Sequence, residues 1–188
     1  MTRTLATFVV WLMVFVVGFA QSAAPTARAG ATDAPVVLTL FADLASEPSA
    51  HAAIVLRRLL ERYPERVAVE IRLRPADGET HPAEAAVVAA ALQERGWEMV
   101  ELLLANQDRR HGRDFSAMAK QLRLDEDQFA AGIANESAAR ARVEDDLAEA
   151  VALKLPKGTV IVADGKPVKP TAAEIEAQFA SLLGTPKF

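Results

Sequence analysis

The chain has no cysteine among its 188 residues. This absence excludes structural disulfides, cysteine-ligated zinc or iron–sulfur sites, a cysteine nucleophile and a lipidated N-terminal cysteine. The nine glycines form neither G-x-G-x-x-G nor G-x-x-x-x-G-K-[ST], so the sequence contains no phosphate-binding loop of these kinds. A formal net charge of −4 argues against the basic surface that nucleic-acid binding requires. The sequence therefore predicts one domain of ordinary size that binds no nucleic acid.

The longest apolar run lies near the N-terminal end of the sequence. Residues 5–20 are almost all apolar or small and follow a single cation, Arg3, which is the pattern of a secretory signal. Small residues at Ala20 and at Ala29 offer two positions for cleavage. The run is slightly short for a spanning helix, but a tilted helix or a thinned bilayer accepts this length. We therefore expect an exported protein, in the periplasm or on the extracytoplasmic face of the bacterial inner membrane.

The sequence predicts three parts in the chain. Residues 1–29 are expected to be a signal peptide or, if they are not removed, an N-terminal membrane anchor. Residues 30–34 are expected to be a linker, because the residues around them are small and polar. Residues 35–188 are expected to fold. With the anchor retained, the chain would be a structural subunit of an envelope complex, and the anchor would be its contact with the membrane.

The folded part begins with a predicted β-α-β unit. Residues 35–41 form an apolar run rich in β-branched side chains, which is typical of a buried strand. Apolar residues three and four apart predict a helix over residues 50–63, capped by Ser46 or Ser49. Residues 67–73 alternate between apolar and polar, which predicts a second strand. A helix between two nearby strands favours a parallel pair.

Helical periodicity dominates the middle of the chain. A proline directly after His81 predicts a helix start, and the pattern predicts an inserted all-helical subdomain from about residue 81 to 153. Trp97 and Met99 are expected to be core residues. The charges between residues 140 and 149 are expected to lie on a solvated helix face.

A predicted hairpin and a last helix end the chain. Residues 159–163 and 166–168 flank an Asp-Gly pair, the preferred two-residue hairpin turn. Thr171 with Glu174 three residues later predicts the start of a final helix. The predicted fold is therefore α/β (α+β), with a thioredoxin-like β-α-β…β-β-α core and the helical subdomain inserted at its middle.

Four segments resemble the DsbA-like thioredoxin-fold family. Residues 41–49 stand where the family has a strand end followed by F-x-D-F-x-C-P-x-C. Residues 97–107 are similar to W-E-M-x-x-L-L-x-A-N-Q, and residues 141–146 are similar to A-R-V-E-x-D. The segment that begins at Gly158 is similar to G-T-P-T-F-x-x-N-G-K. The resemblance extends over nearly all of residues 35–188 and implies a thioredoxin domain with inserted helices.

Two departures fall on the reactive positions of that family. Ser46 and Ser49 occupy the places of both cysteines. Thr159, or a one-residue deletion, stands where the family has a cis-proline. We expect a trans bond there, because a cis bond before a residue other than proline costs about 2.5–4 kcal/mol. A serine hydroxyl is far less acidic than a thiol and cannot form a mixed disulfide, so thiol–disulfide oxidoreductase activity is excluded.

The resemblance implies a protein-binding or peptide-binding module that has lost its redox reaction. In this family the surface around the start of the first helix and the proline loop receives extended polypeptide, and binding there needs no thiol. The expected partner is an extended or unfolded polypeptide or an envelope protein, without a cofactor or a metal. The candidate contacts are Ser46, Glu47, Pro48 and Ser49 at the degenerate active-site position, together with Gly158, Thr159 and His81.

The sequence leaves other hypotheses for these polar residues. Kappa-class glutathione transferases share the inserted plan and look like S-P-Y-S here, which implies that Ser46 would bind a glutathione thiolate, although Glu47 would repel it. A hydrolase that pairs Ser46 with His51 lacks a third group to orient the imidazole. A metal site of His51, His81 and His111 lacks the i, i+4 pairing of common helical sites.

Overall fold

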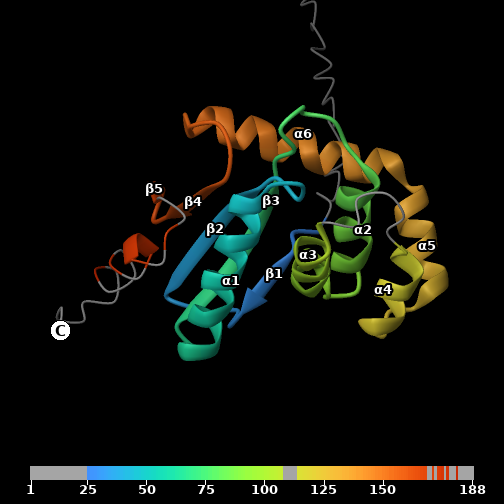
Figure 1. Cartoon of the computed structure of the whole chain (residues 1–188), viewed down its shortest axis with the longest axis horizontal. Helices are drawn as coiled ribbons and strands as arrows, with labels where there is room; N and C mark the ends of the chain where they lie inside the picture. The colour runs from blue at the N-terminus through green and yellow to red at the C-terminus, as the bar shows by residue number, and fades with distance from the viewer. Residues whose placement is uncertain are drawn as a thin grey trace, which may run out of the picture.

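The computed structural model of the chain describes residues 25–107 and 114–168, together with several positions between 171 and 181. A five-stranded mixed sheet lies at its centre, in the order β1-β3-β2-β4-β5 (Figure 1). The strands are β1 (Arg28–Gly30), β2 (Val36–Ala42), β3 (Val67–Leu73), β4 (Val160–Ala163) and β5 (Lys166–Val168). The predicted α/β, thioredoxin-like plan is therefore confirmed.

The predicted β-α-β unit is present. Strands β2 and β3 are parallel, from Val36 opposite Val67 to Ala42 opposite Leu73. Helix α1 (Glu47–Arg62) connects them and buries its apolar face. Because the two strands are parallel and in register, their carboxyl ends meet at one edge of the sheet. The residues that follow these ends come together there.

The folded part of the chain begins before the predicted boundary at Pro35. Strand β1 pairs antiparallel with β3, and Ala27 just before it is only 4% exposed. Ala27 packs so closely on Gly96 that a Cβ added at Gly96 would lie 2.7 Å from the Ala27 Cβ. Of the predicted linker over residues 30–34, Gly30 ends β1 and residues 31–34 lie in the connection from β1 to β2. Residues 1–24, which hold most of the predicted signal or anchor, lie outside the described residues.

Five helices lie between β3 and β4 in the sequence. They are α2 (Pro82–Ala91), α3 (Gly96–Ala105), α4 (Phe115–Gln121), α5 (Glu126–Ala134) and α6 (Glu136–Ala152). In Figure 1, α2 to α5 cluster beside the sheet, and α6 runs from that cluster back across the sheet. Trp97 and Met99 are buried in the core as predicted, with exposures of 5% and 0%. The side chain of Asn135 caps α6 by accepting a hydrogen bond from the Ala138 backbone N–H.

The hairpin turn has the predicted chemistry. Strands β4 and β5 pair antiparallel across Asp164 and Gly165, which have φ values of 49° and 69°. Both residues thus adopt the left-handed conformation that a type I′ turn requires. After the hairpin, the Thr171 hydroxyl accepts a hydrogen bond from the Glu174 backbone N–H, as expected for the start of a helix.

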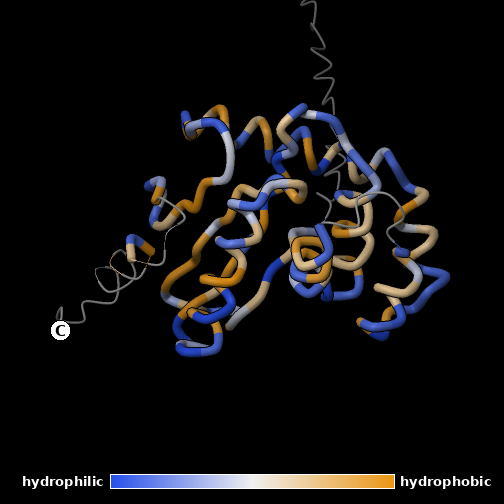
Figure 2. The backbone as a smooth tube through the Cα atoms, viewed as in Figure 1, coloured by the Kyte–Doolittle hydropathy of each residue, from blue (hydrophilic) through white to orange (hydrophobic). Residues whose placement is uncertain are grey.

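Apolar residues are concentrated in the strands and on the helix faces packed beside them (Figure 2).

The predicted solvated face of α6 is wrong at two positions, because Asp146 is 0% exposed and Arg142 is 9% exposed. Their side chains pair with each other across one helical turn, and the Leu73 backbone N–H donates to Asp146 at 2.7 Å. Burial raises the pKa of the Asp146 carboxyl, and the hydrogen bond from Arg142 opposes that effect.

Among the helices of the described residues, none combines the length and apolar character needed to cross a membrane.

Candidate functional site

The start of α1 places the two serines of the degenerate motif. Ser46 is the N-cap, and its hydroxyl accepts a hydrogen bond from the Ser49 backbone N–H at 3.3 Å. Pro48 fits the first turn, where a helix has N–H groups without intrahelical partners. The helix therefore begins at Glu47 rather than at Ala50, and Ser49 lies inside it instead of capping it.

Three hydroxyl groups meet beneath this helix start. The Ser46 and Ser49 oxygens are 2.9 Å apart, and the Thr159 hydroxyl lies 3.1 Å from the first and 2.7 Å from the second. Asp43 provides further partners, because its carbonyl accepts from the Ser46 hydroxyl at 3.1 Å and its N–H donates to the Ser49 hydroxyl at 3.1 Å. We call Ser46, Ser49 and Thr159 the hydroxyl trio. Each hydroxyl oxygen lies within hydrogen-bond distance of the other two, which gives the trio a closed arrangement.

Thr159 comes from the loop that precedes β4. No peptide bond among the described residues is cis, so the bond before Thr159 is trans, as predicted. Gly158 has a φ of 87°, a conformation that glycine adopts readily. Arg74 holds this loop, because its Nη1 donates to the Pro156 carbonyl at 2.7 Å and to the Gly158 carbonyl at 3.1 Å.

A glutamine from the helical subdomain holds the other side of the site. The Gln107 Nε2 donates to the Ser46 carbonyl at 2.8 Å and to the Leu44 carbonyl at 3.2 Å. The Asp43 carboxylate accepts from the Ala45 N–H at 2.8 Å, which forms a tight turn ahead of the helix. The loop between β2 and α1 is thus held by its own turn, by the hydroxyl trio and by the inserted helices.

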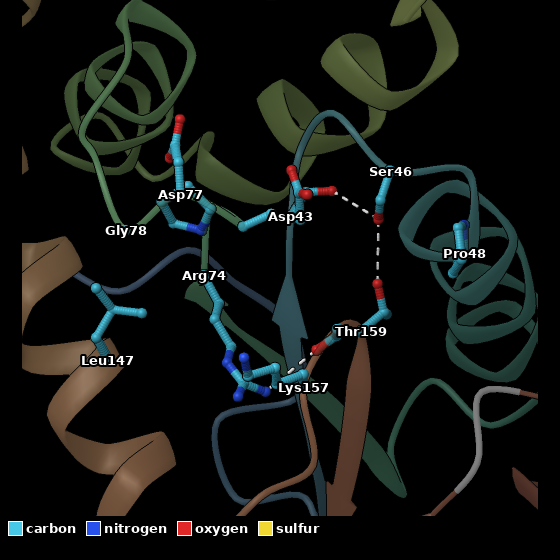
Figure 3. Close-up of a pocket in the computed structure, with 12 residues that line it drawn as sticks. Asp43, Ser46, Pro48, Arg74, Asp77, Gly78, Leu147, Lys157 and Thr159 are labelled. Atoms are coloured by element: carbon cyan, nitrogen blue, oxygen red, sulfur yellow. Dashed lines mark hydrogen bonds between the residues drawn. The ribbon is translucent and has the colours of Figure 1, made fainter.

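A pocket of about 460 Å³ opens beside the hydroxyl trio (Figure 3). Three loops form most of its wall: the start of α1, the segment after β3 and the segment before β4. Leu147 of α6 contributes an apolar side chain. The lining residues are Asp43, Ser46, Pro48, Arg74, Pro75, Ala76, Asp77, Gly78, Leu147, Lys157, Gly158 and Thr159.

The predicted contact residues divide into two groups around this pocket. Four of them line it: Ser46, Pro48, Gly158 and Thr159. Ser49 is fully buried beneath it, with 0% exposure, and the exposed Glu47 is not part of the lining. His81 lies farther along, where its Nε2 is 3.0 Å from the Asp77 carboxylate. Whether any of them binds a partner stays a prediction.

The enzyme hypotheses have little geometric support in the described residues. The Ser46 hydroxyl makes all of its side-chain contacts within the hydroxyl trio and the adjacent backbone, and none with His51. No group of three or more histidine or acidic residues in the described ranges could hold a metal ion. His111 of the weighed histidine set lies outside those ranges.

A buried carboxyl group supports the segment beside the pocket. Glu84, in the first turn of α2, is 3% exposed and accepts a hydrogen bond from the His81 backbone N–H at 3.0 Å. This pairing confirms that His81 begins the helix, as predicted. Burial raises the pKa of the Glu84 carboxyl, although hydrogen bonds from the backbone oppose the change.

Comparison with known proteins decides the family. The family model described as thioredoxin matches residues 22–179. The chain belongs to the thioredoxin family. No curated protein sequence matches the chain.

Solved structures narrow the fold to the DsbA-like form. The thiol-disulfide exchange protein alpha-DsbA2 of Wolbachia pipientis has a TM-score of 0.72 at 13% identity, over 86% of this chain and 87% of that one. BdbD of Bacillus subtilis has a TM-score of 0.70 at 17% identity, over 85% and 93% of the two chains. ScsC of Proteus mirabilis has a TM-score of 0.68 at 18% identity, over 87% and 74%. At these identities the likeness concerns the fold.

Sequence reasoning missed two positioning residues, Arg74 and Gln107. Arg74 directly follows β3, and the pocket-lining Asp43 directly follows the parallel strand β2. Because ligand sites in such sheets lie beyond the carboxyl ends of the strands, this placement was a usable signal. Gln107 ends the segment that resembles the DsbA-like family, but its sequence position alone does not indicate which loop it holds.

Proposed function

We propose that this protein is an exported, redox-inactive DsbA-like module that binds extended or unfolded polypeptide in the pocket beside the hydroxyl trio. One observation carries the proposal: the start of α1 and the loop before β4 are held together by hydroxyl contacts of 2.7–3.1 Å, and a pocket of about 460 Å³ remains open next to them. These contacts and the open pocket support polypeptide binding that needs no sulfur.

The hydroxyl trio favours a structural over a catalytic role. A serine nucleophile needs a neighbouring base that takes its proton. In the described residues, the hydrogen-bond partners of Ser46 and Ser49 are hydroxyls and backbone groups. Since none of these is a base, the trio is suited to fixing two loops and leaves both serines weak nucleophiles.

The residues that line the pocket support a polypeptide partner. Its wall combines apolar side chains such as Pro48 and Leu147 with hydroxyl and charged groups from three separate loops. An extended peptide presents the same mixture, since alternate side chains point in opposite directions and its backbone supplies hydrogen-bonding groups.

The test is the binding of a fluorescently labelled, permanently unfolded polypeptide, followed by anisotropy. Ala76 lines the pocket and is exposed, so Ala76→Trp should fill part of the pocket and weaken binding about tenfold or more. Ala130→Trp is the matched control, because Ala130 is exposed on α5 and outside the lining. Absence of saturable binding, or equal effects of the two variants, would contradict the proposal.

The glutathione-binding alternative is tested in the same protein. The Ser46 hydroxyl is already engaged by the trio, which argues against its binding a thiolate. Glutathione should therefore leave the melting temperature unchanged, since only a ligand of the native state raises it. A rise with glutathione but not with S-methylglutathione would support the transferase hypothesis instead.

Export is the second part of the proposal. One structural neighbour is described as a periplasmic thioredoxin-like protein from Salmonella enterica, and it has a TM-score of 0.59. Between the two candidate cleavage positions, we propose the one after Ala20. Cleavage after Ala29 would cut through β1, whereas cleavage after Ala20 retains the buried Ala27.

Intact-mass measurement of the protein from the cell envelope tests this step. Loss of residues 1–20 supports the proposal. An unprocessed N-terminus would support the hypothesis of an anchored structural subunit, and loss of residues 1–29 would contradict the argument from β1.

A further inference from the structure

The charged side chains that line the pocket differ in whether they have partners within the protein. It is lined by two carboxylates, Asp43 and Asp77, and by two cations, Arg74 and Lys157. Asp43 accepts from the Ala45 N–H at 2.8 Å. Asp77 accepts from the Glu79 N–H at 3.0 Å and lies 3.0 Å from the His81 ring. Both contacts lower the pKa of the Asp77 carboxyl, the backbone hydrogen bond from Glu79 most of all. The carboxylates thus already have partners within the protein.

The two cations have no carboxylate partner among the described residues. Arg74 uses its Nη1 to hold two loop carbonyls, and neither Arg74 nor Lys157 takes part in an ion pair there. Figure 3 shows Arg74 extending from the end of β3 toward Lys157, away from Asp77. Arg72, two residues earlier in the chain, instead contacts three acidic residues.

The N-terminal end of α1 adds partial positive charge to that of the two cations. Helix α1 is 16 residues long, and its N-terminal end, at Ser46 and Pro48, opens on the pocket. The unpaired N–H groups of a helix N-terminus carry a partial positive charge and favour anions. Two cations without a carboxylate partner and this helix end therefore converge on one pocket.

We propose that the pocket selects acidic segments of extended polypeptide, with an aspartate or glutamate side chain bound between Arg74 and Lys157. This inference rests on the proposed function and specifies the partner of the same site. The apolar wall near Leu147 accepts the methylene groups of such a side chain, while the guanidinium and ammonium groups bind its carboxylate. Charge complementarity selects this class of peptide over basic ones, because Arg74 and Lys157 repel a basic side chain.

The test uses three peptides of one length, acetylated and amidated, in which the central residue is glutamate, glutamine or lysine. The glutamate peptide should bind about three- to fivefold more tightly than the glutamine peptide, and the lysine peptide should bind most weakly. The preference should shrink as salt is added, because exposed charges are screened.

Two variants test which groups provide the selection. Lys157→Gln and Arg74→Gln should each remove most of the difference between the glutamate and glutamine peptides. Lys166→Gln on β5 and Arg58→Gln on α1 are the matched controls, since both residues are exposed and outside the lining. Lys157→Gln is the cleaner variant, because Arg74 also holds the loop before β4.

The outcomes separate this inference from the proposed function. Equal binding of all three peptides would overturn the acidic selection and leave polypeptide binding intact. Failure of every peptide and of the unfolded polypeptide to bind would overturn both. A fourth peptide with a free C-terminal carboxylate and glutamine at its centre completes the set, and tight binding of that peptide alone would overturn the assignment to an acidic side chain.

Discussion

Two polar clusters in this protein each join two separate segments of the chain, one with neutral groups and the other with charged groups. The hydroxyl trio joins the start of α1 to the loop before β4 with neutral groups. A second cluster, Arg72, Arg142 and Asp146, joins β3 and α6 with buried or half-buried charges. We call it the charged cluster.

The charged cluster is held by ion pairs and hydrogen bonds between β3, α6 and the N-terminal segment. In the charged cluster, the Asp146 carboxylate accepts from Arg142 and from the Leu73 N–H, while Arg72 reaches Glu149 at 2.6 Å. Arg142 also donates to the Thr26 hydroxyl at 3.1 Å, which connects the cluster to the N-terminal segment. The charged cluster thus joins the sheet to α6 through ion pairs, whereas the trio uses no charged side chain, and the nearby Arg74 and Lys157 have no ion-pair partner among the described residues.

The largest expected effect follows from removing the carboxylate of the charged cluster. Asp146→Ala should lower the free energy of unfolding by about 3–5 kcal/mol, because it leaves a buried guanidinium without its anion. Urea unfolding measures the change. Asp145→Ala on the same helix is the control, since Asp145 is exposed, and a similar loss in both variants would contradict the role of the cluster.

Removal of the N-terminal strand should have the next largest effect. A chain that begins at Gly30 loses the buried Ala27 and the 2.6 Å pair between Arg28 and Glu70. It should be less stable by about 2–3 kcal/mol than a chain that begins at Gln21, given the lost hydrogen bonds and packing. Thermal unfolding of the two chains compares them directly, and equal stabilities would show that β1 is dispensable.

Substitutions in the hydroxyl trio should lower the free energy of unfolding by a smaller amount. Ser49→Ala removes the one fully buried hydroxyl of the trio and leaves the Asp43 N–H without that acceptor, at a cost of about 1–3 kcal/mol. Ser46→Ala should cost about 1 kcal/mol through the lost helix cap. Chemical unfolding of both variants ranks them. A larger loss for Ser46→Ala would mean that capping, rather than the closed trio, dominates.

Substitution of Glu84 should change the stability of the protein least, and the change should depend on pH. Because burial raises its pKa, the folded state binds a proton more readily than the unfolded state, so this group's contribution to stability falls as pH rises through the raised value. Glu84→Gln should therefore be more stable than the original protein at pH 7, with the difference disappearing at about pH 4 and below. Melting temperatures across this range test it. The exposed Glu65→Gln should show no such trend, and an equal trend in both variants would contradict the assignment.

Features of the fold could be predicted from the sequence where the contacts that form them join residues close together in the chain. Hairpin and cap signals such as Asp164-Gly165 and Ser46 worked because the turn and the helix end are built from neighbouring residues. Strand β1 was missed because three residues give no periodicity, and its stability comes from a pair with Glu70 far along the chain.

The site was predictable in part for the same reason. The family resemblance brought Ser46, Ser49 and Thr159 to one place, but their closed contacts and the part played by Arg74 depend on the folded arrangement of three loops. The buried pair of Arg142 and Asp146 has the i, i+4 spacing of a surface pair. Only its contact with β3 distinguishes it.

The most direct test of the account is amide chemical-shift mapping of the 15N-labelled protein during titration with an unlabelled, unfolded polypeptide. Binding in the pocket should give saturable shifts at Ser46, at Arg74, over residues 76–78 and over residues 157–159, with no comparable change on α5. An absence of saturable shifts, or shifts confined to residues away from the pocket, would contradict the claim that this cysteine-free site binds polypeptide.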